Sequence, residues 1–195
     1  MKRILQGDEA IVEGALKAGI GFFAAYPITP ASEIMHTIAK TDVEFLHAED
    51  EIASINMIIG ASLAGAKAMT STSGPGMSLK LEGIGLAHMM DVPIVVVNVQ
   101  RVGPGTGMPT LPSQADLLQT KYGAHGDHYQ IVLYPNSVEE CYKYTIEAFN
   151  AAEESLSPVI LLCDGFIGHL YENIDPDKIE FKIINRKREP FGKGN

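Results

Sequence analysis

Apolar and polar residues follow one another in blocks along this chain, and the blocks have two different periods. Short, nearly continuous apolar runs are typical of buried strands, and longer segments with an apolar face every three to four residues are typical of helices. The predicted strands are 21–26, 43–47, 68–73, 94–99, 130–134 and 159–163. The predicted helices are 8–18, 30–40, 49–64, 76–90, 113–119 and 138–154, with a Gly/Pro-rich loop at 102–112.

The regular alternation of strand and helix predicts the fold class. We expect an α/β fold with a doubly wound, mostly parallel sheet and helices on both faces. The run Ile-Val-Val-Val at 94–97 has no polar alternation, as expected for a strand buried on both faces. Ligands of such sheets bind beyond the carboxyl ends of the strands, so the loops that follow the strands are the places to look for chemistry.

Composition and charge narrow the functional classes. The 195 residues are 46% hydrophobic and 20% charged, which suits one large domain with its own core. A net charge of −9 disfavours nucleic-acid binding. Residues 178–195 hold six Lys or Arg and two acids, so we predict a domain at 1–170 and a basic tail or linker at 171–195.

Three further features bear on the cellular compartment and on the state of the cysteines. No apolar run approaches the roughly 20 residues of a membrane span, and the first residues do not form a signal peptide, so the cytoplasm is the expected compartment. Cys141 and Cys163 are the only cysteines and are expected to be free thiols. Without a CxxC motif, the chain by itself cannot hold an iron–sulfur cluster or a four-thiolate zinc.

Glu51 is the most informative candidate. It opens a helix directly after a predicted strand, and residues 52–64 carry no charge. A carboxyl group between an open strand end and a core can hold or share a proton. Acids also favour helix N-termini because of the macrodipole and the free N–H groups, and two of the three acids at 49–51 are expected to serve that purpose.

Two other strand ends carry polar residues, each with a simple structural explanation. Thr29, between Pro27-Ile28 and Pro30, can be an N-cap or can donate to an anionic ligand, and the pattern alone favours the cap. The turn Thr-Ser-Thr-Ser-Gly-Pro-Gly at 70–76 lets another molecule approach closely. It lacks the lysine of a P-loop, and taken alone it is a tight strand–helix turn.

Arg101 follows directly on a predicted strand and is the one arginine away from the chain ends. A guanidinium there suits carboxylate or phosphate recognition, and a surface salt bridge is the open alternative. The pair His125 and His128 is a poor metal signal, and a hydrogen-bonded loop histidine is favoured. Asp164, in Cys-Asp-Gly, predicts a strand-end turn.

Taken together, four of these segments closely resemble the alpha subunit of 2-oxoacid:ferredoxin oxidoreductases. They are Tyr-Pro-Ile-Thr-Pro at 26–30, Glu-Asp-Glu-Ile-Ala at 49–53, the turn at 70–76, and Val-Gln-Arg with Gly-Pro-Gly-Thr-Gly at 99–107. The match is specific in order and spacing and covers about residues 5–170. The segment 114–128, above all Gly-Asp-His at 126–128, looks most like the 2-oxoglutarate (KorA-type) branch.

The resemblance implies the pyrimidine-binding domain of a thiamine diphosphate enzyme. Glu51 matches the glutamate that hydrogen-bonds the aminopyrimidine ring and takes part in catalysis, and Thr29 and Arg101 match residues that hold the substrate carboxylate. The cofactor-side residues that it implies are Pro27, Ile28, Ser73, Gly74 and Gly76. The implied reaction is oxidative decarboxylation of a 2-oxoacid, with 2-oxoglutarate favoured, to the acyl-CoA with electrons passed to ferredoxin.

The chain departs from the family pattern in ways that imply partners. It has neither the Gly-Asp-Gly…Asn diphosphate–magnesium motif nor cluster cysteines, so Mg²⁺ and the iron–sulfur cluster are expected on a beta subunit or a separate ferredoxin-like subunit. A hetero-oligomer is therefore expected, and the chain alone should be inactive. The alpha subunits that this chain resembles continue into a second α/β domain. Residues 171–195 would be the linker to that domain. Interface candidates are Met89, Met90, Met108 and 103–107.

Two alternatives stay open. The chain could be the pyrimidine-domain half of another thiamine diphosphate enzyme, such as a decarboxylase or a transketolase-like protein. It could also be a non-catalytic α/β interaction module that kept the fold and lost the chemistry.

Overall fold

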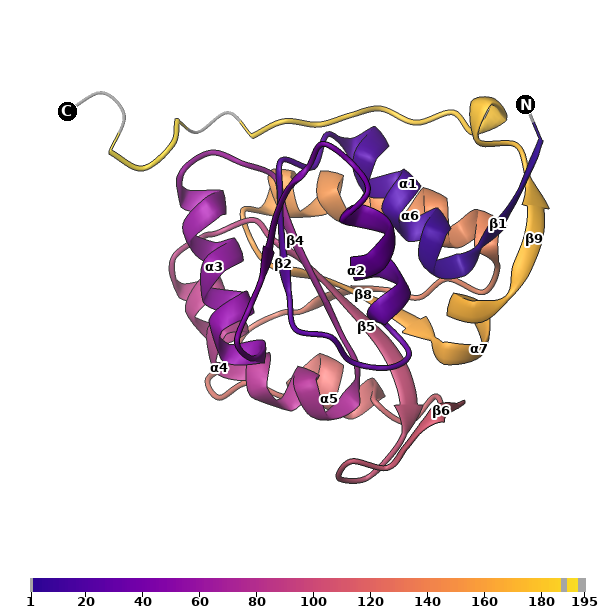
Figure 1. Cartoon of the computed structure of the whole chain (residues 1–195). Coiled ribbons are helices and arrows are strands. Elements are labelled where there is room, and N and C mark those ends of the chain that lie inside the picture. The colour runs from indigo at the N-terminus through magenta and orange to yellow at the C-terminus, as the bar shows by residue number, and fades with distance from the viewer. Residues whose placement is uncertain (1, 187–188, 193–195) are drawn as a thin grey trace.

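A seven-stranded, mostly parallel sheet runs through the molecule, as seen in the computed structural model, which describes residues 2–186 and 189–192 (Figure 1). The strands are β1 Arg3–Gln6, β2 Phe22–Ala25, β3 Glu44–His47, β4 Ala68–Thr72, β5 Val95–Val102, β6 Met108–Pro112, β7 Ile131–Leu133, β8 Val159–Asp164 and β9 Tyr171–Ile174. The helices are α1 Gly7–Ala18, α2 Ser32–Ile38, α3 Glu51–Leu63, α4 Gly74–Met89, α5 Leu117–Tyr122, α6 Val138–Ser155, α7 Gly165–His169 and a 3-10 helix η1 Pro176–Lys178.

The strand order confirms the predicted doubly wound fold. The main sheet has the order β3-β2-β4-β5-β8-β7, with every neighbouring pair parallel, and β6 alone runs antiparallel, beside β5. Because β3 and β4 flank β2, the connection from β2 runs in one direction and the connection from β4 to β5 runs in the other. Ligands of open α/β sheets bind beyond the carboxyl ends of the strands at such a reversal.

Two hydrophobic cores cover the two faces of the sheet. The helices α1, α2 and α6 pack on one face, and α3 and α4 pack on the other (Figure 1). Successive residues of β5 serve opposite cores: Val95 and Val97 belong to the first, and Val96 belongs to the second. This arrangement explains why the sequence of this strand is apolar at successive positions.

Several elements differ from the sequence-based prediction. The loop prediction for 102–112 was wrong for β6, which folds back as an antiparallel partner of β5. The pair β1 and β9 was not predicted; it forms a two-stranded antiparallel sheet with Arg3 opposite Ile174. Both strands have four residues and exposed positions, so their order comes from pairing between the two ends of the chain. The short helix α7 was also not predicted.

The segment predicted as a tail makes many contacts as far as Arg186. After β9, it runs across the molecule toward the end of α3 (Figure 1). Arg186 forms an ion pair with Glu153 at 2.9 Å and donates to the carbonyl oxygen of Ser62 at 2.7 Å. Lys187, Arg188 and 193–195 lie outside the described residues, and the role of 171–195 as a link to a second domain stays a prediction. None of the described helices combines the length and apolar character that a bilayer crossing requires.

The close packing of α3 on α4 can be tested with two glycines in these helices. A Cβ added at Gly83 would lie 2.6 Å from Cγ2 of buried Ile55, whereas a Cβ at Gly60 would meet open space. We expect Gly83→Ala to lower the free energy of unfolding by about 1–3 kcal/mol because of overpacking. Gly60→Ala is the matched control and should raise it by about 0.5–1 kcal/mol, because alanine favours the helix. Urea unfolding measures both, and equal effects would contradict this packing.

Candidate functional site

The candidate site lies where β2, β4 and β5 end, and Arg101 ties its loops together. The Arg101 side chain is only 6% exposed. Its Nη1 donates to the carbonyl oxygen of Thr29 at 2.8 Å, and its Nη2 donates to that of Thr106 at 2.8 Å. Burial lowers the pKa of Arg101, and the nearby negative charge of Glu51 acts against that. The salt-bridge alternative for Arg101 was therefore wrong, since its two Nη groups bind backbone carbonyls.

Thr29 does not cap the following helix, so the N-cap interpretation was wrong. The N-cap of α2 is Ala31, which makes no side-chain capping bond. The helix begins at Ser32, two residues after Pro30, so Thr29 is left in the loop with its carbonyl oxygen bound to Arg101. On the same loop, Pro27 is exposed, and Ile28 packs against the core on the α1 side.

Glu51 is the first residue of α3 and is 7% exposed. Asp50 is the N-cap, because its Oδ1 accepts from the Ala53 amide at 2.7 Å, and Glu49 is exposed. A Cβ on Gly76 would lie 2.6 Å from Glu51 Oε1, so the carboxyl group lies against the first turn of α4. The structure therefore separates one inward-facing acid from its two exposed neighbours, and only glycine at position 76 leaves room for it.

Four buried polar atoms at this edge have no hydrogen-bond partner among the described residues. They are Thr72 Oγ1, Ser73 Oγ, Asn98 Oδ1 and Arg101 Nε. Thr72 at the end of β4 is in register with Asn98 on β5, and Ser73 and Gly74 follow at the start of α4. An unpaired buried polar atom costs about 1–3 kcal/mol, so such a group of atoms indicates a site that a polar ligand completes.

A cavity of about 480 Å³ opens beside this edge, and Gly74, Arg101 and Asp116 are among the residues that line it. Asp116 was not a sequence candidate, because its segment shows no distinctive pattern. Burial raises the pKa of Asp116, and a hydrogen bond from Asn98 Nδ2 at 3.2 Å acts against that. Its amide donates to Gln100 Oε1 at 3.0 Å, so side chains of β5 hold this carboxylate in place.

Lys80 is the second residue that sequence reasoning missed. It is fully buried, and its Nζ donates to Thr70 Oγ1 at 3.2 Å, to the Glu51 carbonyl oxygen at 3.3 Å and to Ser54 Oγ. Burial lowers its pKa to about 7, and the negative charges of Glu51 and Asp50 act against that. A single lysine in a helix that packs against both the sheet and α3 was the available signal.

Three further sequence interpretations concern His128, Asp164 and the two cysteines. His128 is a hydrogen-bonded loop histidine, with Nδ1 3.1 Å from the Gly126 carbonyl oxygen. Asp164 is the last residue of β8 and the N-cap of α7, because its Oδ1 accepts from the Phe166 amide at 2.6 Å, so a helix follows the strand directly and the predicted turn was wrong. Cys141 and Cys163 are free thiols whose sulfurs lie 3.9 Å apart.

The fold and the side chains at its strand ends define an α/β domain with a cavity at the reversal of its sheet, which is where domains of this class bind organic ligands. The chain belongs to the family described as pyruvate flavodoxin/ferredoxin oxidoreductase, thiamine diphosphate-binding, whose model matches residues 13–195.

Similar proteins agree with this assignment. The 2-oxoglutarate synthase subunit KorA of Archaeoglobus fulgidus is 53% identical over 88% of this chain and 51% of the relative. The ketoisovalerate oxidoreductase subunit VorB of Methanothermobacter marburgensis is 45% identical over 87% of this chain and 49% of the relative. A solved structure of 2-oxoglutarate:ferredoxin oxidoreductase from Magnetococcus marinus, with 2-oxoglutarate, coenzyme A and succinyl-CoA bound, superimposes with a TM-score of 0.92 at 44% identity, covering 99% of this chain and 34% of that chain. The chain spans about half the length of the curated relatives it matches.

The buried amino group of Lys80 predicts a pH dependence of stability. Its pKa is about 7 in the folded protein and 10.5 ordinarily, so between these values the unfolded chain binds a proton that the folded chain does not. The penalty of burying the charge is fully present below pH 7, and stability should rise with pH above it, by at most about 1.4 kcal/mol per pH unit. Lys80→Met should lack this rise.

Urea unfolding of wild type and Lys80→Met between about pH 6.5 and about pH 9 measures this difference, because that range covers roughly two pH units above the pKa of Lys80 in the folded protein. Lys40→Met, which removes an exposed lysine, is the control and should follow the wild type. Parallel curves for wild type and Lys80→Met would show that Lys80 is not buried as described.

Proposed function

We propose that this chain is the pyrimidine-side domain of the alpha subunit of a 2-oxoacid:ferredoxin oxidoreductase. Its reaction is the oxidative decarboxylation of 2-oxoglutarate to the acyl-CoA, with electrons passed to ferredoxin. The observation that carries the proposal is the buried carboxyl group of Glu51 against Gly76, at the edge where four polar atoms lack partners. The relatives named for 2-oxoglutarate support the substrate.

The residues at the strand ends fit thiamine diphosphate. Bound there, thiamine diphosphate would supply a nucleophilic carbon and an electron sink for cleaving the bond between the 2-oxo carbon and its carboxylate. Gly74 carries no side chain beside Asp116, so a flat ring can approach the backbone there, and Ser73 Oγ has no partner among the described residues. Glu51 would share a proton between its carboxyl oxygen and a nitrogen of the pyrimidine ring, which is how a carboxyl group at this place promotes proton removal.

Arg101 and Thr29 are proposed to bind the substrate carboxylate. The two Nη groups of Arg101 are fixed by backbone carbonyls, so the side chain is oriented before any ligand arrives. Its Nε has no partner, and its charge is mostly buried, which strengthens attraction to an anion. Thr29, held against Arg101 through its own carbonyl, adds a hydroxyl group.

Partner subunits are part of the proposal. We place Mg²⁺ and the diphosphate on a beta subunit, the iron–sulfur cluster on that or another subunit, and keep ferredoxin and CoA as reaction partners and the cytoplasm as compartment. Exposed apolar side chains support a protein interface next to the site. They lie on β6 and α5: Met108, Leu111, Leu117, Leu118 and Tyr122. The expectation that Met89 and Met90 belong to this interface was wrong, because they lie at the opposite end of α4 from Gly74, roughly 22 Å away along the helix.

Ketoisovalerate is the second candidate substrate, because a relative named for it is 45% identical to this chain. Reduction of a viologen dye by the reconstituted complex, assayed with 2-oxoglutarate, ketoisovalerate and pyruvate in turn, distinguishes the substrates. Fastest reduction with 2-oxoglutarate is expected. Decarboxylation without dye reduction would favour another thiamine diphosphate enzyme. Absence of both, with no cofactor-binding partner recovered, would favour a non-catalytic module.

Replacing Glu51 tests the proposed proton-sharing group. We expect Glu51→Gln to lower kcat in the reconstituted complex by at least about 100-fold, because an amide cannot take up the proton. Asp50→Asn is the matched control: it changes the adjacent acid but keeps a good helix cap, so turnover should stay near the wild-type value. Steady-state dye reduction measures both, and wild-type turnover in Glu51→Gln would exclude the role.

Replacing Arg101 tests carboxylate recognition. Lysine keeps the charge but loses the planar group that bonds to Thr29 and Thr106, so we expect Arg101→Lys to raise KM about 10-fold or more. Arg101→Gln, which also removes the charge, should raise it further, toward about 100-fold. Initial rates against 2-oxoacid concentration give these values. An unchanged KM in both variants would place the carboxylate elsewhere.

A further inference from the structure

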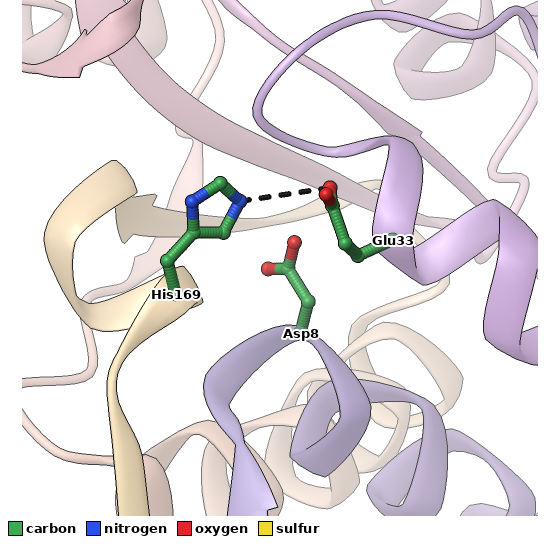
Figure 2. A group of neighbouring side chains, drawn as sticks. All are labelled: Asp8, Glu33 and His169. Carbon is green, nitrogen blue, oxygen red and sulfur yellow. Dashed lines mark ion pairs between the residues drawn. The ribbon is translucent and has the colours of Figure 1, made fainter.

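A second group of titratable side chains lies outside the strand-end site. Asp8 is the second residue of α1, Glu33 is the second residue of α2, and His169 is the last residue of α7. One carboxylate oxygen from each acid and one ring nitrogen of His169 all lie within 4.8 Å of one another. Figure 2 shows the Asp8 carboxyl group pointing into the space between the other two side chains.

Asp8 makes this more than a cluster of acids. It is 0% exposed, and neither of its carboxylate oxygens has a hydrogen-bond partner among the described residues. The backbone closes around it, since a Cβ on Gly168 would lie 2.8 Å from Asp8 Oδ1. Burial raises the pKa of Asp8 well above its usual value, and the charges of Glu33 and Glu9 add to the effect. The fold thus buries a carboxyl group whose two oxygens no described residue satisfies.

Glu33, beside Asp8, also has a buried carboxylate oxygen without a hydrogen-bond partner among the described residues. This oxygen, Oε2, lies 3.5 Å from His169 Nε2. His169 Nε2 is also 3.2 Å from the carbonyl oxygen of Pro30. Within the described residues, neither Asp8 nor Glu33 forms an ion pair with a lysine or arginine. Two carboxyl groups and one imidazole nitrogen therefore converge where no described lysine or arginine neutralises the acids.

We propose that Asp8, Glu33 and His169 form a binding site for one divalent transition-metal ion of the Zn²⁺ class. Two carboxylates and an imidazole are a ligand set that Zn²⁺ accepts, whereas Mg²⁺ and Ca²⁺ prefer oxygen ligands alone. The side chains of Glu33 and His169 are 42% and 40% exposed, so an ion can enter from solvent, with water completing its coordination.

The three ligand atoms would have to move only slightly closer together to bind one ion. Bonds of about 2.1 Å in a tetrahedral site put ligand atoms about 3.4 Å apart, compared with at most 4.8 Å here. Glu33 and His169 are half-exposed and can rotate toward fixed Asp8. His169 would then carry its proton on Nδ1, with Nε2 released from Pro30. The ion would join α1, α2 and α7 next to the loop that contains Thr29.

Metal binding can be measured on the whole 195-residue chain without a histidine tag, after treatment with EDTA. We expect calorimetry with ZnCl₂ and elemental analysis to give one bound Zn²⁺ per chain, with no comparable binding of MgCl₂. At about 100-fold excess over Kd, Zn²⁺ should raise Tm by about 5 °C or more, because the ion binds only the folded state. These readouts do not depend on the proposed enzymatic activity.

Variants locate the ion. Asp8→Asn and His169→Gln should each lose the bound equivalent and the Tm shift, whereas His128→Gln, a control on a distant loop, should keep both. If Asp8→Asn does not fold, the half-exposed His169→Gln decides. Absence of Zn²⁺ binding in the wild type, or binding that survives both Asp8→Asn and His169→Gln, would overturn the proposal and leave a carboxyl cluster with, at most, an adventitious ion elsewhere.

Discussion

The candidate site depends on the burial of the Lys80 amino group at the point where α3, α4 and β4 meet. Lys80, from α4, bonds to Thr70 on β4 and to Ser54 and the backbone of Glu51 on α3. These bonds fix the first turn of α3 relative to the sheet. The glycines of α4 complete the arrangement, because Gly76 and Gly83 let α3 approach within contact distance. The position of the Glu51 carboxyl group follows from this packing.

At the carboxyl edge of the sheet, unpaired polar atoms lie on top of tightly packed strands. Beneath it, the central strands are buried on both faces by two apolar cores. Above it, Thr72, Ser73, Asn98 and Arg101 each have a buried polar atom with no partner in the described part of the chain. A domain keeps such costly atoms only if the cores offset them, and their natural role is to meet a ligand. Arg101 is bonded between two loops, so its charge is held in one position at this edge.

The described residues therefore contain two groups of unpaired buried polar atoms, which we interpret differently. Those at the strand ends come from residues of adjacent strands and helix starts, as expected for an organic ligand that needs several directional contacts. The acceptors of Asp8 and Glu33 face one point and are joined by a histidine nitrogen, which is the arrangement that a single ion requires. The loop from Tyr26 to Pro30 lies between the two, since Arg101 binds its Thr29 carbonyl and His169 its Pro30 carbonyl.

The sequence by itself determined the fold class, the six parallel-sheet strands and the loops where chemistry gathers, because periodicity and chain order are local properties. It also singled out Glu51 and Arg101, which stand out as charges beside apolar segments. Only the tertiary structure decided that Thr29 is no helix cap, that β1 pairs with β9, and that Lys80 and Asp116 belong to the site. It alone brought Asp8 and His169 together. Those facts depend on contacts between residues far apart in the chain. A local sequence pattern does not encode which side chains become buried or which polar atoms remain without a hydrogen-bond partner.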